Sequence, residues 1–401
     1  MTVLQGECCS PVALSVGIGS LTAGKQQSSQ GYCQIAIWGQ HQNRTAVRYQ
    51  GAAEGSIANL SKAKPFPRIE TDDSRVLGHC MMEALPDHGG GVDAAVRRYG
   101  GAREAWLDLS TGINPVAYPV PEFSAQDWGI LPDSDAQDAL TKAARTYWQV
   151  PEYAAVLAAP GASSLIARIP ALLPGGRVWI PAPTYNEHGR AFAAAGWHVT
   201  DTPVTDAQVL VHPNNPDGRV WAASDVTADL CIIDESFCDV MPVESLIEMT
   251  ARPGVIVLKS FGKFWGLAGL RLGFAIGDTA LIERLAQMLG PWPVSGPALR
   301  VGAQALNDAS WAGAARARLA DDAARLDGLV ASAGAKVLGG TSLFRLCDVE
   351  DAVRWQHCLA THQIWTRIFP YSSRWLRLGL PGCDADWVRL AHALECAETG
   401  R

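Results

Sequence analysis

The sequence predicts an α/β protein whose main sheet is largely parallel and carries helices on both faces. Short apolar runs such as 230–233 and 255–258 are typical of buried strands, and helical stretches alternate with them. This alternation favours a parallel sheet that is covered by helices on each side. Several of the apolar runs end in polar loops, which is where parallel sheets bind their ligands.

Composition narrows the class of protein. The chain has 401 residues, of which 48% are hydrophobic and 18% charged, as expected for a globular enzyme of two or three domains. The net charge of −7 gives no reason to expect nucleic acid or a membrane surface as a partner, and no run is long and apolar enough to span a bilayer. The ten cysteines are scattered and form no CxxC pair, which favours reduced thiols in the cytoplasm over a disulfide framework or a metal site.

Residues 1–80 differ from the rest of the chain in composition and in the spacing of their apolar residues. Ser, Gly, Gln and Asn are frequent there, and no helical or strand period persists. The segment is either a disordered extension or lies outside the natural protein, and we favour the second interpretation, with translation starting at Met81 or Met82. We therefore expect a large domain over 81–295, with an amino-terminal arm over 81–130. A linking helix and a small α/β domain are expected over 296–401.

Helices and strands are expected in alternation along the chain. The expected helices are 92–99, 136–148, 165–173, 187–195, 280–289, 297–333, 351–361 and 385–398. The Ala- and Arg-rich stretch 297–333 is expected to be one long helix that joins the two domains. The expected strands lie within 106–115 and at 178–180, 208–211, 230–233, 255–258, 273–276, 342–347, 363–366 and 375–380.

The stretch from Ser260 to Phe274 follows the apolar run 255–258 and is the most informative of the loops. Its lysine, Lys263, has aromatic and aliphatic neighbours and no acidic neighbour in the sequence. A lysine held among apolar groups loses its proton more easily and can act as a nucleophile. Ser260 and Arg271 are placed to hold a phosphate, the arginine through its forked guanidinium group. The alternative, for this segment taken alone, is an incidental lysine in a glycine-rich loop.

Other strand ends carry further candidates. Ala162 and Ser163 follow a glycine at a helix start, which is either an anion site or an ordinary serine cap. Tyr185 stands at the end of a strand, where tyrosine is common for packing reasons alone. Asn215 lies in an Asn-Asn-Pro-Asp-Gly turn, and Asp234 ends a buried strand at a position suited to a ligand.

The sequence allows two interpretations each for Arg377 and His88. Arg377 stands inside an apolar strand, so it is either paired with an anion or turned outward to water. His88 lies beside three glycines and is either an ordinary loop residue or a contact for an anion.

Four motifs occur in one order along the chain: the Gly-Ala-Ser turn, Asn-Asn-Pro, Asp-Glu-Ser-Phe and the lysine loop. Together they resemble the fold-type I pyridoxal-phosphate enzymes, the aspartate aminotransferase superfamily of aminotransferase classes I and II. The resemblance implies a mainly parallel, seven-stranded sheet, a small carboxyl-terminal α/β domain, and pyridoxal 5'-phosphate (PLP) as the cofactor. Lys263 is then expected to bond the cofactor aldehyde, Asp234 to pair with the protonated ring nitrogen and Tyr185 to lie against the ring, which makes these three the expected catalytic residues. The other cofactor-binding residues that the resemblance implies are Ala162, Ser163, Asn215, Ser260 and Arg271.

The first segments after residue 86 narrow the resemblance. His88-Gly89-Gly90 and the stretch Ser110-Thr111-Gly112-Ile113-Asn114-Pro115 resemble the signature of the threonine-phosphate decarboxylases of cobalamin biosynthesis. This implies PLP-dependent decarboxylation of L-threonine O-3-phosphate to (R)-1-aminopropan-2-ol O-2-phosphate, by a cytoplasmic homodimer. The substrate-binding residues that it implies are His88, Gly112, Arg367 and Arg377.

Two alternatives remain open. An aminotransferase of the histidinol-phosphate type would share the cofactor residues, but the His-Gly-Gly start and Phe237, where many relatives carry tyrosine, favour the decarboxylase. Leu131 also replaces a tyrosine of many relatives, which puts an intersubunit hydroxyl contact there in doubt. The other alternative is a non-catalytic protein that binds PLP or a nucleotide, and the absence of the Gly-x-x-x-x-Gly-Lys-[Ser/Thr] spacing counts against a nucleotide loop.

Overall fold

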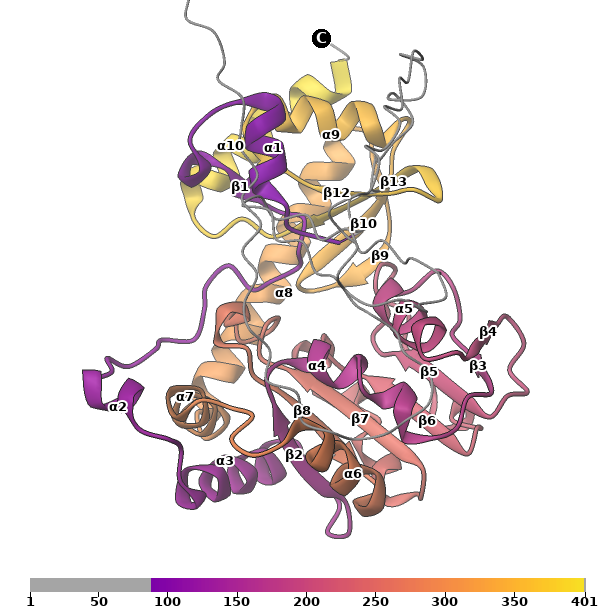
Figure 1. The fold of residues 1–401 in the computed structure, drawn as a ribbon. Coiled ribbons are helices and arrows are strands. Elements are labelled where there is room, and N and C mark those ends of the chain that lie inside the picture. The colour runs from indigo at the N-terminus through magenta and orange to yellow at the C-terminus, as the bar shows by residue number, and fades with distance from the viewer. Residues whose placement is uncertain (1–87, 400–401) are drawn as a thin grey trace, which may run out of the picture. The chain divides into compact units, whose positions relative to one another are not determined.

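The computed structural model describes residues 88–399, so the predicted extension over 1–80 and the start of the predicted arm lie outside the described residues. The larger sheet of the described part has seven strands in the order β2-β8-β7-β6-β5-β3-β4 (Figure 1). Strand β8 runs antiparallel to both of its neighbours, β2 and β7, and all other neighbouring strands are parallel. The strands are β2 (Ala155–Ala159), β3 (Arg177–Trp179), β4 (His198–Thr200), β5 (Ala207–Val211), β6 (Leu230–Asp234), β7 (Val255–Ser260) and β8 (Gly273–Gly277).

Both faces of this sheet are buried, which explains why its central strands are continuous apolar runs. Side chains alternate along a strand, so Cys231 and Ile233 of β6 pack into one core while Leu230 and Ile232 pack into a second core. Helices α3, α7 and α8 contribute to the first core, and α4, α5 and α6 to the second. The predicted α/β fold with helices on both faces is confirmed.

The predicted helices lie close to their expected positions, with two exceptions, and the short helix Ala125–Gly129 was not predicted. The helix bounds are α1 (Val92–Tyr99), α2 (Ala125–Gly129), α3 (Ser134–Tyr147), α4 (Ala162–Ile166), α5 (Asn186–Ala194), α6 (Thr279–Leu289), α7 (Gly296–Leu306), α8 (Ala309–Ser332), α9 (Ala352–Thr361) and α10 (Asp384–Thr399). The predicted helix 165–173 is a short α4 followed by a 3₁₀ turn that contains Pro170, whose ring is incompatible with a continuing α-helix.

The second exception is the predicted long helix 297–333, which is two helices. The chain leaves the helical path after Leu306, and the carboxylate of Asp308 then accepts a hydrogen bond from the backbone N–H of Trp311. That bond is an N-cap, so Asp308 starts a new helix instead of continuing the old one. Figure 1 shows α8 running from beside the large sheet to the small sheet.

A second sheet of four antiparallel strands lies beyond α8, in the order β12-β13-β10-β9. Its strands are β9 (Lys336–Thr341), β10 (Phe344–Asp348), β12 (Arg367–Phe369) and β13 (Ser372–Gly379). The first described segment joins this part of the molecule, because β1 (Leu107–Asp108) pairs with β11 (Ile364–Trp365) and α1 contacts α9 (Figure 1). The loop before α1 is thereby brought to the carboxyl-terminal half of the chain.

Four strands of the structure had no counterpart in the sequence-based expectation: β2, β4, β9 and β12. Strand β2 is largely alanine, which has a low strand propensity, and β4 is a short edge strand. Strand β9 is also an edge strand and contains Gly339 and Gly340, which weaken any strand pattern.

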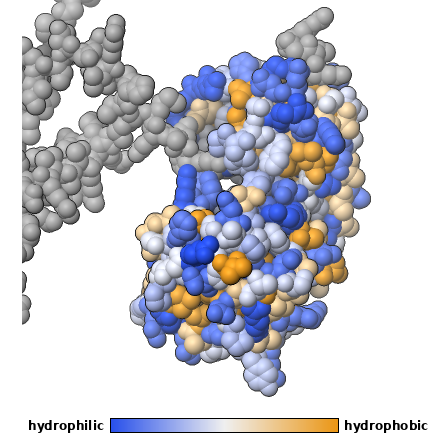
Figure 2. Space-filling model, turned by 90° about the vertical axis from the view of Figure 1, so that its right-hand side faces the viewer, coloured by the Kyte–Doolittle hydropathy of each residue, from blue (hydrophilic) through white to orange (hydrophobic). Residues whose placement is uncertain are grey.

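The outer surface of the described part is mixed in character. On the face drawn in Figure 2, apolar side chains occur in small groups among polar ones. None of the helices between residues 88 and 399 combines the length and the apolar character that a bilayer-spanning segment needs.

The fold brings the predicted loops to one edge of the large sheet. Parallel strands end at a common edge, so the residues that follow β2, β3, β5, β6 and β7 meet there. The antiparallel strand β8 begins at the same edge, which adds Arg271 to the group.

Candidate active site

A pocket of about 200 Å³ lies at this edge of the sheet. Every predicted site residue except Gly112 lines it: His88, Ala162, Ser163, Tyr185, Asn215, Asp234, Ser260, Lys263, Arg271, Arg367 and Arg377. Gly112 lies beside the pocket, and its neighbour Thr111 is the lining residue. A Cβ atom on Gly112 would lie 3.0 Å from Phe344 and 3.4 Å from Phe237, so the glycine makes room for an aromatic wall.

Lys263 lies in the pocket beside that wall. Its Nζ is 5.2 Å from the centre of the Phe237 ring. Desolvation and the charge of Arg377 lower the pKa of Lys263, the charge of Asp234 acts in the opposite direction, and the net result is a pKa of about 8. An amine with a pKa near neutrality supplies both a neutral nucleophile and a proton donor.

Asp234 remains ionised although it is almost fully buried. Burial raises the pKa of Asp234, but hydrogen bonds from His188 and Ser236 outweigh it and the net shift is downward. The Nε2 atom of His188 lies 2.8 Å from Asp234 Oδ2, and the N–H and hydroxyl of Ser236 donate to Oδ1 at 3.0 and 2.5 Å. The site therefore holds a fixed negative charge at the end of β6.

His188 is a residue of the site that its sequence context does not reveal. Its partner is 46 residues away, and a single histidine on a helix carries no signal of such a contact. The one available hint was its spacing from Tyr185, because residues three apart at a helix start share a face. The two rings pack edge to face at 6.1 Å, and burial together with the charge of Asp234 raises the pKa of Tyr185 to about 12.

Ser260, Arg271 and the start of α4 lie at one end of the pocket. Gly161 precedes α4 with a positive φ of 79°, and a Cβ atom there would lie 2.7 Å from the guanidinium group of Arg271. The glycine thus lets the arginine approach the first turn of the helix, where the backbone N–H groups of Ala162 and Ser163 stand. Ser260 Oγ accepts a hydrogen bond of 3.2 Å from the N–H of Gly262, which fixes the hydroxyl beside the lysine loop.

Arg377 points inward, which decides between the two interpretations of its strand. Only 4% of the residue is exposed. Its guanidinium donates to the backbone oxygen of Ser110 at 2.6 Å and to Oδ1 of Asn215, and it lies 5.1 Å from the centre of the Phe344 ring. A buried, positioned guanidinium next to Lys263 is suited to an anionic ligand.

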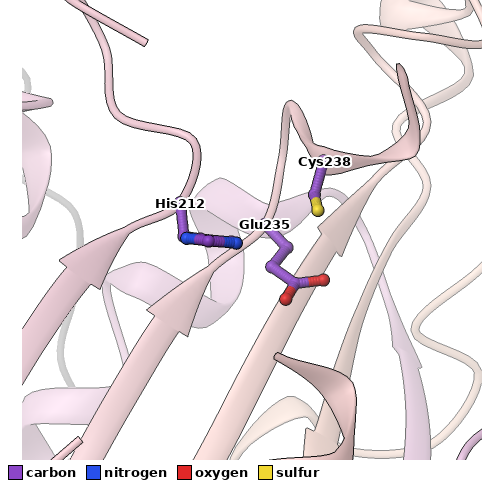
Figure 3. A group of neighbouring side chains, drawn as sticks. All are labelled: His212, Glu235 and Cys238. Atoms are coloured by element: carbon purple, nitrogen blue, oxygen red, sulfur yellow. The ribbon is translucent and has the colours of Figure 1, made fainter. Parts of the chain in front are cut away.

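A neighbouring group of side chains resembles a metal site by composition only. His212, Glu235 and Cys238 converge at the carboxyl ends of β5 and β6 (Figure 3). The Nδ1 atom of His212 accepts from Trp221 N–H at 3.0 Å and Nε2 donates to Glu244 O at 2.6 Å, so both ring nitrogens are engaged. Glu235 forms a 2.5 Å ion pair with buried Lys259. Burial raises the pKa of the Cys238 thiol, which opposes the thiolate form that metals bind. We interpret the group as polar packing under the site.

Comparisons with known proteins agree with this geometry. The family described as aminotransferase class I and II matches residues 106–394. The threonine-phosphate decarboxylase of Pseudomonas aeruginosa is 39% identical over 327 residues, which cover 77% of this chain and 97% of that protein. The histidinol-phosphate aminotransferase of Aeromonas salmonicida is 25% identical over 242 residues, 53% of this chain and 67% of that protein.

A solved structure shares the fold. The histidinol-phosphate aminotransferase of Sinorhizobium meliloti, in complex with pyridoxal-5'-phosphate, superimposes with a TM-score of 0.68 at 18% identity, over 82% of this chain and 98% of that one. The match of the family over most of the sequence and the near full-length match to a curated relative lead to one assignment. This chain belongs to the aminotransferase class I and II family.

Proposed function

We propose that this enzyme is a PLP-dependent decarboxylase that converts L-threonine O-3-phosphate into (R)-1-aminopropan-2-ol O-2-phosphate and carbon dioxide. The observation that carries the proposal is the charge of the pocket. Arg271, Arg367, Arg377 and Lys263 all line it, whereas Asp234 is the one carboxylate among its lining residues. Such an excess of cations suits a substrate that brings both a carboxylate and a phosphate next to a phosphorylated cofactor.

The comparisons support the same choice of reaction. The relative named threonine-phosphate decarboxylase matches at 39% identity over 97% of its length, whereas the relative named histidinol-phosphate aminotransferase matches at 25% over 67%. Phe237, which presents a ring without a hydroxyl to Lys263, supports the decarboxylase as well.

The residues present fit PLP. The start of α4, Ser260 and Arg271 form a set of donors for the cofactor phosphate, and Gly161 leaves the space that a Cβ atom would fill. Ionised Asp234 suits a protonated ring nitrogen, and Tyr185 offers an aromatic face for the ring. Lys263 offers an amine of lowered pKa to the aldehyde, and Asn215 offers an amide to the ring hydroxyl.

The protein groups then have distinct tasks. PLP, when bound, supplies an electron sink next to the substrate α-carbon. The buried negative charge of Asp234 supports this role of the cofactor, because it favours a protonated ring nitrogen. Arg377 binds the substrate carboxylate and, with Arg367 and His88, sets the orientation of the bond between the α-carbon and that carboxylate. When this bond breaks, carbon dioxide leaves and its bonding electron pair stays behind. Lys263, whose pKa is about 8, carries a proton at neutral pH and donates it to the α-carbon, where a C–H bond replaces the bond to the carboxylate.

The location and the assembly state are part of the proposal. We propose a cytoplasmic homodimer. The ten cysteines are scattered along the sequence and form no CxxC pair, a pattern that favours a reducing compartment. The homodimer is inferred from the resemblance to fold-type I enzymes, and equilibrium sedimentation of the purified enzyme tests it.

Product analysis tests the proposed reaction. Holoenzyme is incubated with threonine phosphate that carries a labelled carboxyl group, and in parallel with histidinol phosphate and a keto acid. We expect labelled carbon dioxide and aminopropanol phosphate in the first reaction, identified by mass spectrometry. Transamination in the second reaction without carbon dioxide in the first would instead establish the histidinol-phosphate type of aminotransferase.

A further inference from the structure

The carboxylate of Glu187 lies next to His88, one of the residues that line the pocket. The Nε2 atom of His88 lies 3.1 Å from Oε1 of Glu187, on the first turn of α5. The same oxygen lies 3.1 Å from NH1 of Arg190, which is outside the pocket. Both side chains of the His88–Glu187 pair are 34% exposed, so the contact forms at the mouth and not in the core.

The backbone that carries His88 is fixed by other contacts. The N–H of Gly90 donates to Ser110 Oγ at 2.6 Å, and the indole of Trp365 donates to the oxygen of Gly90 at 3.0 Å. A Cβ atom on Gly89 would lie 2.5 Å from Ser110 O, so the loop packs closely on the segment that follows β1. These hydrogen bonds fix the backbone of the loop. The orientation of the His88 ring depends on the contacts of the ring itself.

Glu187 is the charged group that meets the ring. The imidazole centre lies 6.2 Å from that of Tyr185, which is a packing contact without a hydrogen bond. The other ring nitrogen, Nδ1, is buried and has no hydrogen-bond partner among residues 88–399. A buried polar atom without a partner needs an explanation, and because His88 lines the pocket we infer that a bound ligand supplies the missing partner.

We propose that Glu187 is a positioning residue for the substrate phosphate and that it acts through His88. The carboxylate accepts from Nε2–H, and in the imidazolium form of His88 the Nδ1–H group is the donor that remains for a phosphate oxygen. This inference rests on the proposed function, because it assumes a substrate with a phosphate ester. The ligand class is an alkyl phosphate monoester attached near an amino acid α-carbon.

A positioning role for Glu187 predicts a change in phosphate binding opposite to the change that charge repulsion alone predicts. A carboxylate near a phosphate repels it, so removal of Glu187 would strengthen phosphate binding if the residue had no other effect. If Glu187 positions His88, its removal weakens binding. Because the pair is partly exposed, we expect a change of about three- to fivefold.

Binding of isopropyl phosphate to the PLP-loaded enzyme tests the inference without any turnover. This probe is a phosphate monoester that lacks an amino group, so it reports on the phosphate position alone. Its Kd is measured by calorimetry for the wild type, Glu187→Gln, His88→Ala and the double variant. We expect each single variant to bind about three- to fivefold more weakly and the double variant to bind no more weakly than His88→Ala.

Arg190→Gln is the matched control, because it removes the other contact of Glu187 and leaves the His88–Glu187 pair in place. It should bind isopropyl phosphate like the wild type. Tighter binding by Glu187→Gln, additive losses in the double variant, or an equal loss in Arg190→Gln would each overturn the proposal.

Kinetics on threonine phosphate provide a second readout. Glu187→Gln should raise KM for threonine phosphate, and the kcat/KM for unphosphorylated threonine should not change. If the wild type releases no carbon dioxide from threonine phosphate, the proposed function fails while the isopropyl phosphate measurement still decides the role of Glu187.

Discussion

The Nε2 atom of His188 lies 2.8 Å from Oδ2 of Asp234, and both side chains are almost fully buried. A carboxylate accepts hydrogen bonds only, so the imidazole donates through Nε2–H. This places a rigid donor behind the carboxylate that we assign to the cofactor ring nitrogen. The pair ties α5, which begins just after Tyr185, to the end of β6.

The first prediction concerns this pair. In His188→Leu, the buried carboxylate of Asp234 loses one of its hydrogen-bond donors, and leaving a buried acceptor unsatisfied typically costs about 1–3 kcal/mol. The pKa of Asp234 is lowered in the folded enzyme, so its contribution to stability is present above the unfolded pKa of about 3.9 and is lost as the pH falls through the folded pKa. We expect His188→Leu to unfold at a higher pH during acid titration followed by circular dichroism.

The control for this experiment is His198→Leu on the exposed edge strand β4, which should unfold like the wild type. His188→Leu should also bind PLP more weakly, measured by cofactor fluorescence. Acid unfolding and PLP affinity that both match the wild type would show that His188 does not support Asp234.

The second prediction separates two lysines that are close in sequence. Lys259 is buried, and burial lowers its pKa, but its ion pair with Glu235 and the charge of Asp239 outweigh this and raise it. Lys263 has its pKa lowered to about 8. Only Lys263 therefore offers a neutral amine, and Lys263→Ala should lose both the absorbance of lysine-bound cofactor and the decarboxylase activity. Borohydride reduction followed by peptide mapping checks the site, and a reduced adduct on Lys259 would contradict the assignment.

The third prediction is a pH dependence of cofactor loading. The neutral amine is the nucleophile, so the rate at which apoenzyme captures PLP should rise with pH and level off above about 8. Because the charge of Arg377 contributes to the lowered pKa, Arg377→Ala should move the midpoint of this rise to a higher pH. Stopped-flow absorbance between pH 6 and 10 measures both curves. A midpoint near 10 in the wild type would mean that burial does not lower the pKa of Lys263.

How well each strand could be predicted from the sequence depended on whether one or both of its faces are buried. Strands β6 and β7 are buried on both faces, so nearly every residue is apolar and the runs stand out. Edge strands such as β9 have no such run, because one side meets solvent and glycines interrupt it. The break between α7 and α8 depends on one capping bond of Asp308, which a run of helix-forming residues conceals.

The candidate site was predictable where a residue stands in a local motif. Lys263, Asp234 and Asn215 belong to short patterns at strand ends, and the structure places all three in one pocket. The partners of these residues were not predictable, because they come from distant segments. His188 meets Asp234 from 46 residues away, and Glu187 meets His88 through a contact that only the folded chain creates.

The fourth prediction concerns residues 1–81. The described chain from residue 88 onward contains all the strands of both sheets described above and the residues that line the pocket. An enzyme that starts at Met82 should therefore fold, bind PLP and turn over like the full-length chain. Thermal unfolding and steady-state kinetics of the two proteins measure this. Loss of activity or aggregation on truncation would show that the extension takes part in the folded enzyme.

The last prediction concerns Arg377, which connects the substrate and cofactor sides of the pocket. Its guanidinium donates to Ser110 O and to Asn215 Oδ1 at the same time, which requires the forked geometry of arginine. Lysine keeps the charge but presents a single point donor. Loss of such a buried, hydrogen-bonded partner of an anion typically costs about 2–5 kcal/mol. Arg377→Lys should therefore lower kcat/KM for threonine phosphate by roughly 30-fold or more.

The comparison that isolates the guanidinium is Arg374→Lys. Arg374 is on the same strand, but it forms an exposed pair with Asp348, away from the pocket. Because exposed pairs contribute about 1 kcal/mol or less, this variant should keep the kcat/KM of the wild type within a fewfold range. Both enzymes are assayed with PLP in excess, so that a change in cofactor affinity through Asn215 does not enter the comparison. Equal kcat/KM values in Arg377→Lys and Arg374→Lys would mean that charge alone suffices at position 377 and that its forked geometry has no part in the reaction.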